Sequence, residues 1–303
     1  MMSREEKSNK LLKEMKKDEK RKKVHKVIKI LLIIFFLIIT FVFLLFIYMR
    51  FVATSNLIVK EYKVLNNNLP DSYNGLKIVH FTDLHYNSTV DKASLTSIVK
   101  KINNLKPDIV VFTGDLVSES DYLTDEDITD LISAFNDIEC TISKYVIRGN
   151  HDYHHDYFNK VFDQTNFIFL DNSYDLIYYK SNDPILINGL GSKIKGDTNI
   201  DKAFEIKQQA NYFTITLIHE PDTIDDILNS YDIDLCLSGH SHNGQIRLPF
   251  LGALGTIKGA KKYDDPYYRV NNTDLYISGG IGTSSYKLRF FNRPSINFYR
   301  LTK

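Results

Sequence analysis

The longest apolar stretch of the chain is the run from Ile30 to Met49, ILLIIFFLIITFVFLLFIYM, which has 20 residues and no charged one. Because a helix rises about 1.5 Å per residue, such a run can cross the roughly 30 Å hydrocarbon layer of a bilayer. The pattern therefore predicts one transmembrane helix over residues 30–49. A cleaved signal peptide is the alternative, but its apolar core is usually only about 7 to 15 residues long. The stretch VATS, residues 52–55, keeps that alternative open.

Beyond residue 75, short apolar runs alternate with segments of helical periodicity. Helices are predicted over 91–105 and 124–138, where apolar residues recur three and four positions apart after acidic starts. Seven runs have the length of strands and end in polar residues: LKIVHFTDLH, DIVVFTGDLV, YVIRGNHD, DPILINGLGS, FTITLIHEPD, DLCLSGHSH and LYISGGIG. Alternating strands and helices predict an α/β sheet. After Leu235 the strand-like runs are separated by short turns, which predicts a mainly antiparallel second sheet.

These patterns predict four parts of the chain. They are a basic tail over 1–29, the transmembrane helix over 30–49, a linker over 50–74 with a candidate edge strand, and one domain over 75–303. A domain of this length is large but within the usual range.

Charge is distributed unevenly, although the formal net charge is only +1. Of the 38 Lys and Arg residues, 12 lie between Arg4 and Lys29, and the remainder of the chain is mildly acidic. The composition therefore indicates no nucleic-acid surface. Because basic residues near a membrane span stay on the cytoplasmic side, we expect a cytoplasmic N-terminus and a domain outside the cell membrane. The tail either binds anionic lipid as well or acts only as a topology signal.

Residues that bind metals or move protons follow five of the predicted strands, and five of the nine histidines are among them. Ligands bind at the carboxyl ends of strands in α/β sheets, so these side chains are expected to converge. Side chains two apart on an extended segment face the same way, so we expect each such pair to reach one location, whereas adjacent Asn150 and His151 face differently. The residues are Asp83 and His85, Asp115, Asn150 to Asp152, His219, and His240 with His242.

Seven of these residues are too many ligands for one tetrahedral ion but suit two ions that share Asp115. Oxygen and nitrogen donors without thiolates favour manganese, iron or zinc over a structural zinc cage. We expect manganese, with iron or zinc as alternatives. Two ions would leave the site positive and attractive to an anion, and such a pair can activate water for displacement at phosphorus. The residues therefore predict phosphate ester hydrolysis.

The segments DLH, GDLV, GNHD, HEPD and GHSHNGQ occur in an order that resembles the calcineurin-like metallophosphoesterases, over essentially residues 75–303. The resemblance implies a four-layer α/β/β/α sandwich with a dinuclear metal centre, in which a hydroxide between the metals attacks phosphorus. It implies that His151 contacts the phosphate or protonates the leaving group, and that Asp152 orients His151. It also implies a division of the ligands: Asp83, His85 and His242 on the first metal, Asn150, His219 and His240 on the second, and Asp115 between them.

The C-terminal segments GHSHNGQIRLPFLGAL and GGIGTSSYKLRFFNRPSINFYRL resemble a membrane-associated bacterial branch that hydrolyses lipid-linked sugar nucleotides such as UDP-2,3-diacylglucosamine. That branch more often has two glycines where Asn243 and Gly244 stand, which bears on loop shape and substrate preference. The resemblance therefore implies a lipid-linked phosphodiester or pyrophosphate substrate. A soluble nucleotide or other phosphoester is the alternative substrate. A catalytically inactive, membrane-anchored binding or scaffold protein is the alternative of another class.

Three further residues have two interpretations each. His154 and His155 follow GNHDY in a loop, where they either contact substrate or are simply solvated. Arg293 either binds a phosphate or carboxylate or forms a structural ion pair.

Overall fold

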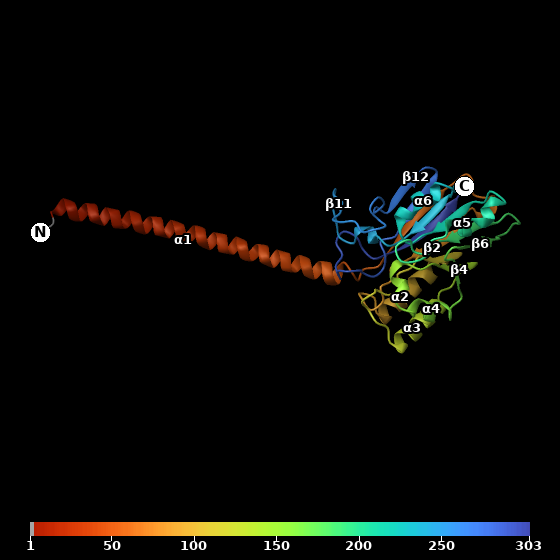
Figure 1. Ribbon diagram of the computed structural model, residues 1–303. Helices are drawn as coiled ribbons and strands as arrows, with labels where there is room; N and C mark the ends of the chain where they lie inside the picture. The colour runs from red at the N-terminus through yellow and green to blue at the C-terminus, as the bar shows by residue number, and fades with distance from the viewer. Residues whose placement is uncertain (1–2) are drawn as a thin grey trace. The chain divides into compact units, whose positions relative to one another are not determined.

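The structure is a computed structural model that describes residues 3–303 and divides into two compact units between Tyr48 and Met49. The first unit is one helix, α1 (Arg4–Ile47), followed by the π-helical turn η1 (Tyr48–Val52) (Figure 1). Ser3 begins α1 with a capping box, because its hydroxyl accepts from Glu6 N–H while the Glu6 carboxylate accepts from Ser3 N–H. Residues 30–47 of the predicted membrane span therefore continue a helix that also contains residues 4–29 of the basic tail. This helix is long and apolar enough to cross a membrane.

The first sheet of the second unit has six strands in the order β1-β14-β2-β3-β4-β5. Neighbouring strands are parallel except β14 and β2, which are antiparallel. The strands are β1 (Ile58–Leu65), β14 (Ser295–Thr302), β2 (Lys77–Phe81), β3 (Ile109–Phe112), β4 (Ser143–Val146) and β5 (Phe167–Phe169). Strand β1 pairs with β14 along its whole length, so residues 58–65 belong to the sheet.

The second sheet also has six strands, in the order β12-β13-β9-β8-β7-β6. These are β12 (Tyr267–Val270), β13 (Thr273–Ile277), β9 (Leu235–Ser238), β8 (Thr214–Leu217), β7 (Ile185–Gly189) and β6 (Ser173–Ile177). The four central strands, β13, β9, β8 and β7, run parallel to one another. The outer strands β12 and β6 are antiparallel to their neighbours β13 and β7. The prediction of a mainly antiparallel second sheet was wrong, because β13 joins the parallel strand β9 and β14 crosses to the first sheet.

Helices cover the outer face of each sheet, which makes four layers (Figure 1). The longest are α2 (Lys92–Asn104) and α3 (Asp125–Asn136), which confirm the two predicted helices and begin after the capping residues Asp91 and Thr124. With α4 (Tyr157–Phe162) they pack on the first sheet, whereas α5 (Ile200–Ala203) and α6 (Ile224–Leu228) pack on the second. The α/β/β/α sandwich implied by the resemblance is thus confirmed.

Shorter elements occupy the loops between these layers. They are the single helical turns η2 (Asp71–Tyr73), η3 (Asn150–Tyr153), η4 (Glu205–Gln208), η5 (Pro221–Thr223) and η6 (His242–Gly244), and the two-stranded hairpin of β10 (Arg247–Leu248) and β11 (Gly252–Ala253).

Residues of the strands alternate between the two faces of each sheet. In β3, Ile109 and Val111 pack between the sheets, whereas Val110 and Phe112 pack under the helices. In β9, Leu235 and Leu237 face the other sheet. Apolar side chains on both faces explain why these strands read as continuous apolar runs in the sequence.

We predict that Leu237→Ala lowers the free energy of unfolding by about 2–5 kcal/mol, because Leu237 is fully buried between the sheets and its loss leaves a cavity. Urea unfolding of the detergent-solubilised full chain measures this loss. Leu65→Ala, at a strand residue that is 62% exposed, is the control and should change the value by less than about 0.5 kcal/mol. Equal effects of the two substitutions would contradict the packing described here.

Candidate metal centre

The candidate residues all follow strands whose carboxyl ends meet at one edge of the two sheets. They lie in the loops after β2, β3, β4, β8 and β9, which are parallel neighbours within their sheets. Six of the seven predicted ligands are buried, and Asn150 is half-buried. The buried six are Asp83, His85, Asp115, His219, His240 and His242.

The backbone at these loops is left-handed, with positive φ at five predicted ligands: Asp83 (51°), His85 (41°), Asp115 (59°), His240 (65°) and His242 (48°). Non-glycine residues rarely adopt this conformation, and such strain is concentrated at functional sites. Asp83 and His85 reach one location, as predicted, whereas His240 and His242 do not. The extended backbone assumed for both pairs is absent, because the strands end at Phe81 and Ser238 before the ligands begin.

The first group of side chains comprises Asp83, His85 and His242, whose ligand atoms lie within 4.8 Å of one another. Nε2 of His242 lies 3.1 Å from Nε2 of His85 and 3.4 Å from Oδ1 of Asp83. Three donor atoms therefore point at one small volume.

The second group comprises Asp115, His219 and His240, within the same limit. Nε2 of His219 lies 3.2 Å from Oδ2 of Asp115. Thus His240 and His242, only two residues apart, belong to different groups.

Oδ2 of Asp115 lies between the two groups. It is 3.2 Å from Nε2 of His219 in the second group and 3.7 Å from Nε2 of His85 in the first. A single carboxylate oxygen facing histidines of both groups has the position needed to bridge two cations.

Hydrogen bonds to the outer ring nitrogens orient the histidines. Nδ1 of His219 donates to Thr113 O at 2.6 Å, and Nε2 of His240 donates to Lys258 O at 2.8 Å. Each bond turns the other ring nitrogen toward the centre, where it can bind a metal once it is deprotonated. Nδ1 of His85 is likewise 2.9 Å from the Ser118 hydroxyl.

Burial and neighbouring charges shift the pKa values of these groups. Burial lowers the pKa of His85 to about 3 and also lowers those of His240 and His242, so these rings are neutral at pH 7. Burial and the Asp115 charge raise the pKa of Asp83 to about 7. Although burial opposes it, the Asp115 carboxylate holds the pKa of His219 well above its usual value.

The fit of these residues to metal cations can be judged from two buried atoms, Oδ1 of Asn150 and Nε2 of His219. Neither has a hydrogen-bond partner among the described residues, and burial of an unpaired polar atom costs about 1–3 kcal/mol. Nε2 of His219 faces a carboxylate oxygen at 3.2 Å, an arrangement that needs a positive charge, either a proton or a metal ion. The donors thus fit two divalent cations.

His151 lies beside this centre and is reachable from solvent. Its side chain is 22% exposed, and its Nε2 lies 3.9 Å from Oδ2 of Asp115. Glu119 N–H donates to its Nδ1 at 3.3 Å, so the neutral ring carries its proton on Nε2, the nitrogen that faces the centre. His151 therefore has the position of a proton donor.

Asp152 lies behind the loops that carry the candidate ligands. Its carboxylate is buried and accepts from three backbone N–H groups, those of Asp115, Leu116 and Gly149, each at 2.8 Å. Both oxygens are therefore used to join the loops after β3 and β4. Asp152 thus fixes the backbone of Asp115 and of Gly149, which begins the turn that carries Asn150 and His151.

Sequence reasoning missed Arg289, the largest fully buried side chain of the second unit. Its guanidinium donates to Gly280 O at 3.0 Å and Gly282 O at 2.6 Å, and lies 3.5 Å from Nδ1 of His242. Arg293, the arginine singled out from the sequence, is exposed. The two arginines belong to one segment and differ in burial, and no pattern in the sequence predicts which of them is buried.

His154 and His155 lie on the Glu119 segment. Nε2 of His154 forms an ion pair with the Glu119 carboxylate, and His155 is 3.3 Å from Glu119 O. Neither belongs to the two ligand groups.

Four layers with paired histidine and carboxylate groups at the carboxyl ends of their central strands define a metal-dependent hydrolase. Residues 76–244 match the model of the calcineurin-like phosphoesterase family, and the chain belongs to that family. It is accordingly a metal-dependent phosphoester hydrolase, and the scaffold alternative is set aside. The family depends on a dinuclear metal centre, and the two ligand groups provide its sites.

Three relatives show how the similarity is distributed. An uncharacterized metallophosphoesterase of Bacillus subtilis, YkuE, is 30% identical over 84% of this chain and 88% of its own length. The UDP-2,3-diacylglucosamine pyrophosphatase LpxG of Chlamydia trachomatis is 27% identical over 78% of this chain and 87% of its own. A transmembrane protein with a metallophosphoesterase domain from Danio rerio is 29% identical over 75% of this chain and 53% of its own.

We predict that Mn²⁺ binds the metal-free full chain more weakly as pH falls from 8 to 6. The raised pKa of Asp83, about 7, and that of His219 mean that protons compete for both ligands, at roughly tenfold in affinity per pH unit for each proton. Calorimetry in buffers of different ionisation enthalpy measures the protons released. His25→Gln, in the exposed part of α1, should leave that number unchanged. Affinity independent of pH would contradict the arrangement.

Proposed function

We propose that this protein is a membrane-anchored, dinuclear-metal phosphoesterase that hydrolyses a phosphodiester or pyrophosphate bond of a lipid-linked substrate. The observation that carries the proposal is the position of the Asp115 carboxylate between two groups of buried ligands, with Nε2 of His151 at 3.9 Å. A site that holds two cations and one proton donor suits an anionic phosphoester.

Each ligand group would hold one ion. Asp83, His85 and His242 would bind the first, and Asn150, His219 and His240 the second, with Asp115 shared. Two ions bound there would supply an activated water between them and neutralise charge on the phosphate oxygens. We expect manganese, because the donors are carboxylate and amide oxygens and imidazole nitrogens without thiolate.

His151 would act as a hydrogen-bond donor to the phosphate or the leaving oxygen. The Glu119 N–H group fixes its ring so that Nε2 carries the proton on the side of the ligands. A hydrogen bond from this nitrogen would stabilise the negative charge that develops on the leaving oxygen. Asp152 is the positioning residue of this step, since it holds the backbone of Asp115 and of Gly149.

Two observations support a lipid-linked substrate. One is the apolar helix α1, which can hold the hydrolase at a membrane. The other is the similarity to LpxG, a UDP-2,3-diacylglucosamine pyrophosphatase. A substrate confined to the bilayer would meet an enzyme confined to the same surface.

The proposed location is the cell membrane, with the N-terminus in the cytoplasm and the hydrolase outside. The charge asymmetry around the apolar run supports it, with ten Lys or Arg in residues 10–29 and only Arg50, Lys60 and Lys63 in the 20 residues after Met49.

We predict that His151→Ala lowers kcat for a phosphodiester with an alcohol leaving group by about 10²–10³-fold, because the leaving oxygen loses its hydrogen-bond donor. Metal analysis of the same sample should still find two ions per chain, since none of the ligands is removed. His154→Ala, which breaks an exposed ion pair with Glu119, is the matched control and should keep nearly full activity.

Unchanged turnover in His151→Ala would remove this residue from the mechanism. A variant that loses both activity and metal would instead place His151 among the ligands.

We also predict that protease added to intact cells cleaves the unit beyond Met49, while an epitope tag before α1 stays protected until the cells are permeabilised. Immunoblots with and without permeabilisation measure both. Protection of the hydrolase unit in intact cells would reverse the proposed topology and change the available substrates.

A further inference from the structure

The hairpin of β10 and β11 presents its most apolar residues to solvent. Phe250 is 108% exposed and Leu251 is 77% exposed, and both lie in the turn between the strands. Burial of apolar side chains stabilises a folded protein, so an exposed Phe and Leu at a tip forgo that stabilisation. An apolar tip of this kind indicates a partner that removes it from water.

Backbone geometry supports the same conclusion. Phe250 has φ = 68°, a left-handed backbone conformation that bulky side chains rarely adopt. The base of the hairpin is nevertheless firmly held, since the Arg247 guanidinium donates to Asn243 O at 2.9 Å and pairs with the Asp265 carboxylate. The fold therefore holds a strained apolar tip on a fixed base.

The hairpin base is joined to the point where the chain leaves its apolar run. Arg247 N–H donates to Phe290 O at 2.9 Å, and Phe290 N–H donates to Gln245 O at 3.2 Å. The adjacent Arg289 N–H donates to the carbonyl of Met49, the last residue of that run, at 3.1 Å. Phe291, 65% exposed, follows in the same segment. The residue at which the run ends is therefore held by the same segment as the hairpin base.

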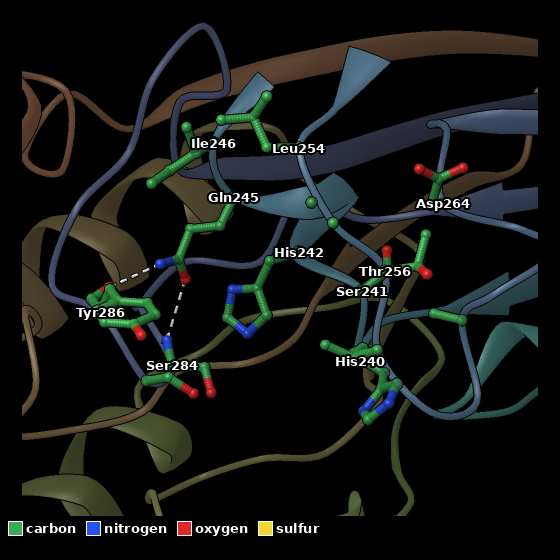
Figure 2. A pocket seen from close by; sticks show the side chains of 15 residues that line it. His240, Ser241, His242, Gln245, Ile246, Leu254, Thr256, Asp264, Ser284 and Tyr286 are labelled. Carbon is green, nitrogen blue, oxygen red and sulfur yellow. Dashed lines mark hydrogen bonds between the residues drawn. The ribbon is translucent and has the colours of Figure 1, made fainter. Parts of the chain in front are cut away.

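A cavity of about 370 Å³ lies between the hairpin base and the metal centre (Figure 2). His240 and His242 line its inner end, and Ile246 and Leu254 line another wall, where Leu254 N–H donates to Ile246 O at 3.2 Å. Leu254 is 62% exposed. The cavity thus leads from an exposed apolar wall to the ligands of the proposed ions.

Two hydrogen bonds of Gln245 join neighbouring segments of the cavity wall. The Gln245 amide donates to Tyr286 O at 2.6 Å and accepts from Ser284 N–H at 3.1 Å, as the dashed lines in Figure 2 show. These bonds join the hairpin base to the 284–286 loop, and Tyr286 itself is 71% exposed. The wall of the cavity and the exposed tip are therefore parts of one connected structure.

We propose that the β10–β11 hairpin is a membrane-docking element, in which Phe250 and Leu251 enter the bilayer interface and the adjacent cavity takes the hydrocarbon part of a bilayer lipid. The phosphoester of that lipid would then reach the metal centre without leaving the membrane surface. This inference rests on the proposed phosphoesterase function and specifies its substrate as one with an apolar chain next to the scissile phosphate.

Docking can be measured with a single tryptophan, because the chain contains none. Full-length Phe250→Trp protein is reconstituted into vesicles of phosphatidylcholine and phosphatidylglycerol, with and without bromine on the acyl chains. We expect blue-shifted emission that brominated lipid quenches at least twofold. Tyr178→Trp, at a residue 60% exposed after β6, is the matched control and should show neither effect.

Two results would overturn docking. One is emission from the Phe250→Trp protein that matches the emission of the control. The other is a blue shift without quenching by bromine, which would mean that protein rather than lipid covers the tip.

The cavity is tested with methyl and octyl esters of p-nitrophenyl phosphate, each below its micellar concentration. Each buried methylene favours binding up to roughly fourfold, so kcat/KM of the full chain should be at least tenfold higher for the octyl ester. Leu254→Asp should lower this octyl-to-methyl ratio toward one, while Leu254→Met should keep it.

The outcomes separate the two proposals. Hydrolysis of both esters at equal kcat/KM would overturn the cavity assignment but leave the phosphoesterase proposal intact. Hydrolysis of neither ester by the manganese-loaded protein would contradict the phosphoesterase proposal itself.

Discussion

The centre of this structure depends on a buried carboxylate that needs positive charge on two sides. Asp115 is only 2% exposed, and its Oδ2 faces histidines of both ligand groups. Burial makes an unpaired charge expensive, so the arrangement is stable only with protons or metal ions around it. The raised pKa values of Asp83 and His219 are the response to this demand when protons supply the charge. Divalent ions satisfy the same demand with all ligands deprotonated.

Both sheets are needed to assemble the ligands around that carboxylate. The backbone N–H of His240, from the second sheet, donates to the Asp83 carboxylate of the first at 3.1 and 3.2 Å. Glycines allow the loops to approach this closely. A Cβ on Gly149 would lie 2.3 Å from Oδ1 of Asp115, and one on Gly280 would lie 3.0 Å from Nδ1 of His242. Packing between the sheets therefore compensates for the left-handed backbone at the ligands.

The sequence was most informative where a residue type and its position after a strand act together. Helices α2 and α3 could be predicted because capping residues and apolar periodicity are local signals. The candidate ligands could be named because histidine and aspartate at strand ends are rare outside functional sites. What Asp152 binds could not be predicted, since its three N–H partners come from loops that meet only in the fold.

Other features depend on tertiary contacts and have no local signal. Strand β13 belongs to the second sheet and β14 to the first, and this assignment depends on the strands that each one pairs with. Arg289 and Arg293 have similar local surroundings in the sequence, and only the packing around Gly280 and Gly282 separates the buried one. Phe250 reads as part of an ordinary strand-like run, GQIRLPF, and its full exposure is visible only in the folded hairpin.

The proposed mechanism requires two ions that share the Asp115 carboxylate. Electron paramagnetic resonance of the manganese-loaded full chain tests this most directly, because two Mn²⁺ ions joined by one carboxylate are magnetically coupled. We expect the multiline spectrum of a coupled pair, replaced in Asp115→Ala by the six-line signal of isolated ions. A six-line signal alone in the unaltered protein, with one ion per chain, would contradict the shared carboxylate.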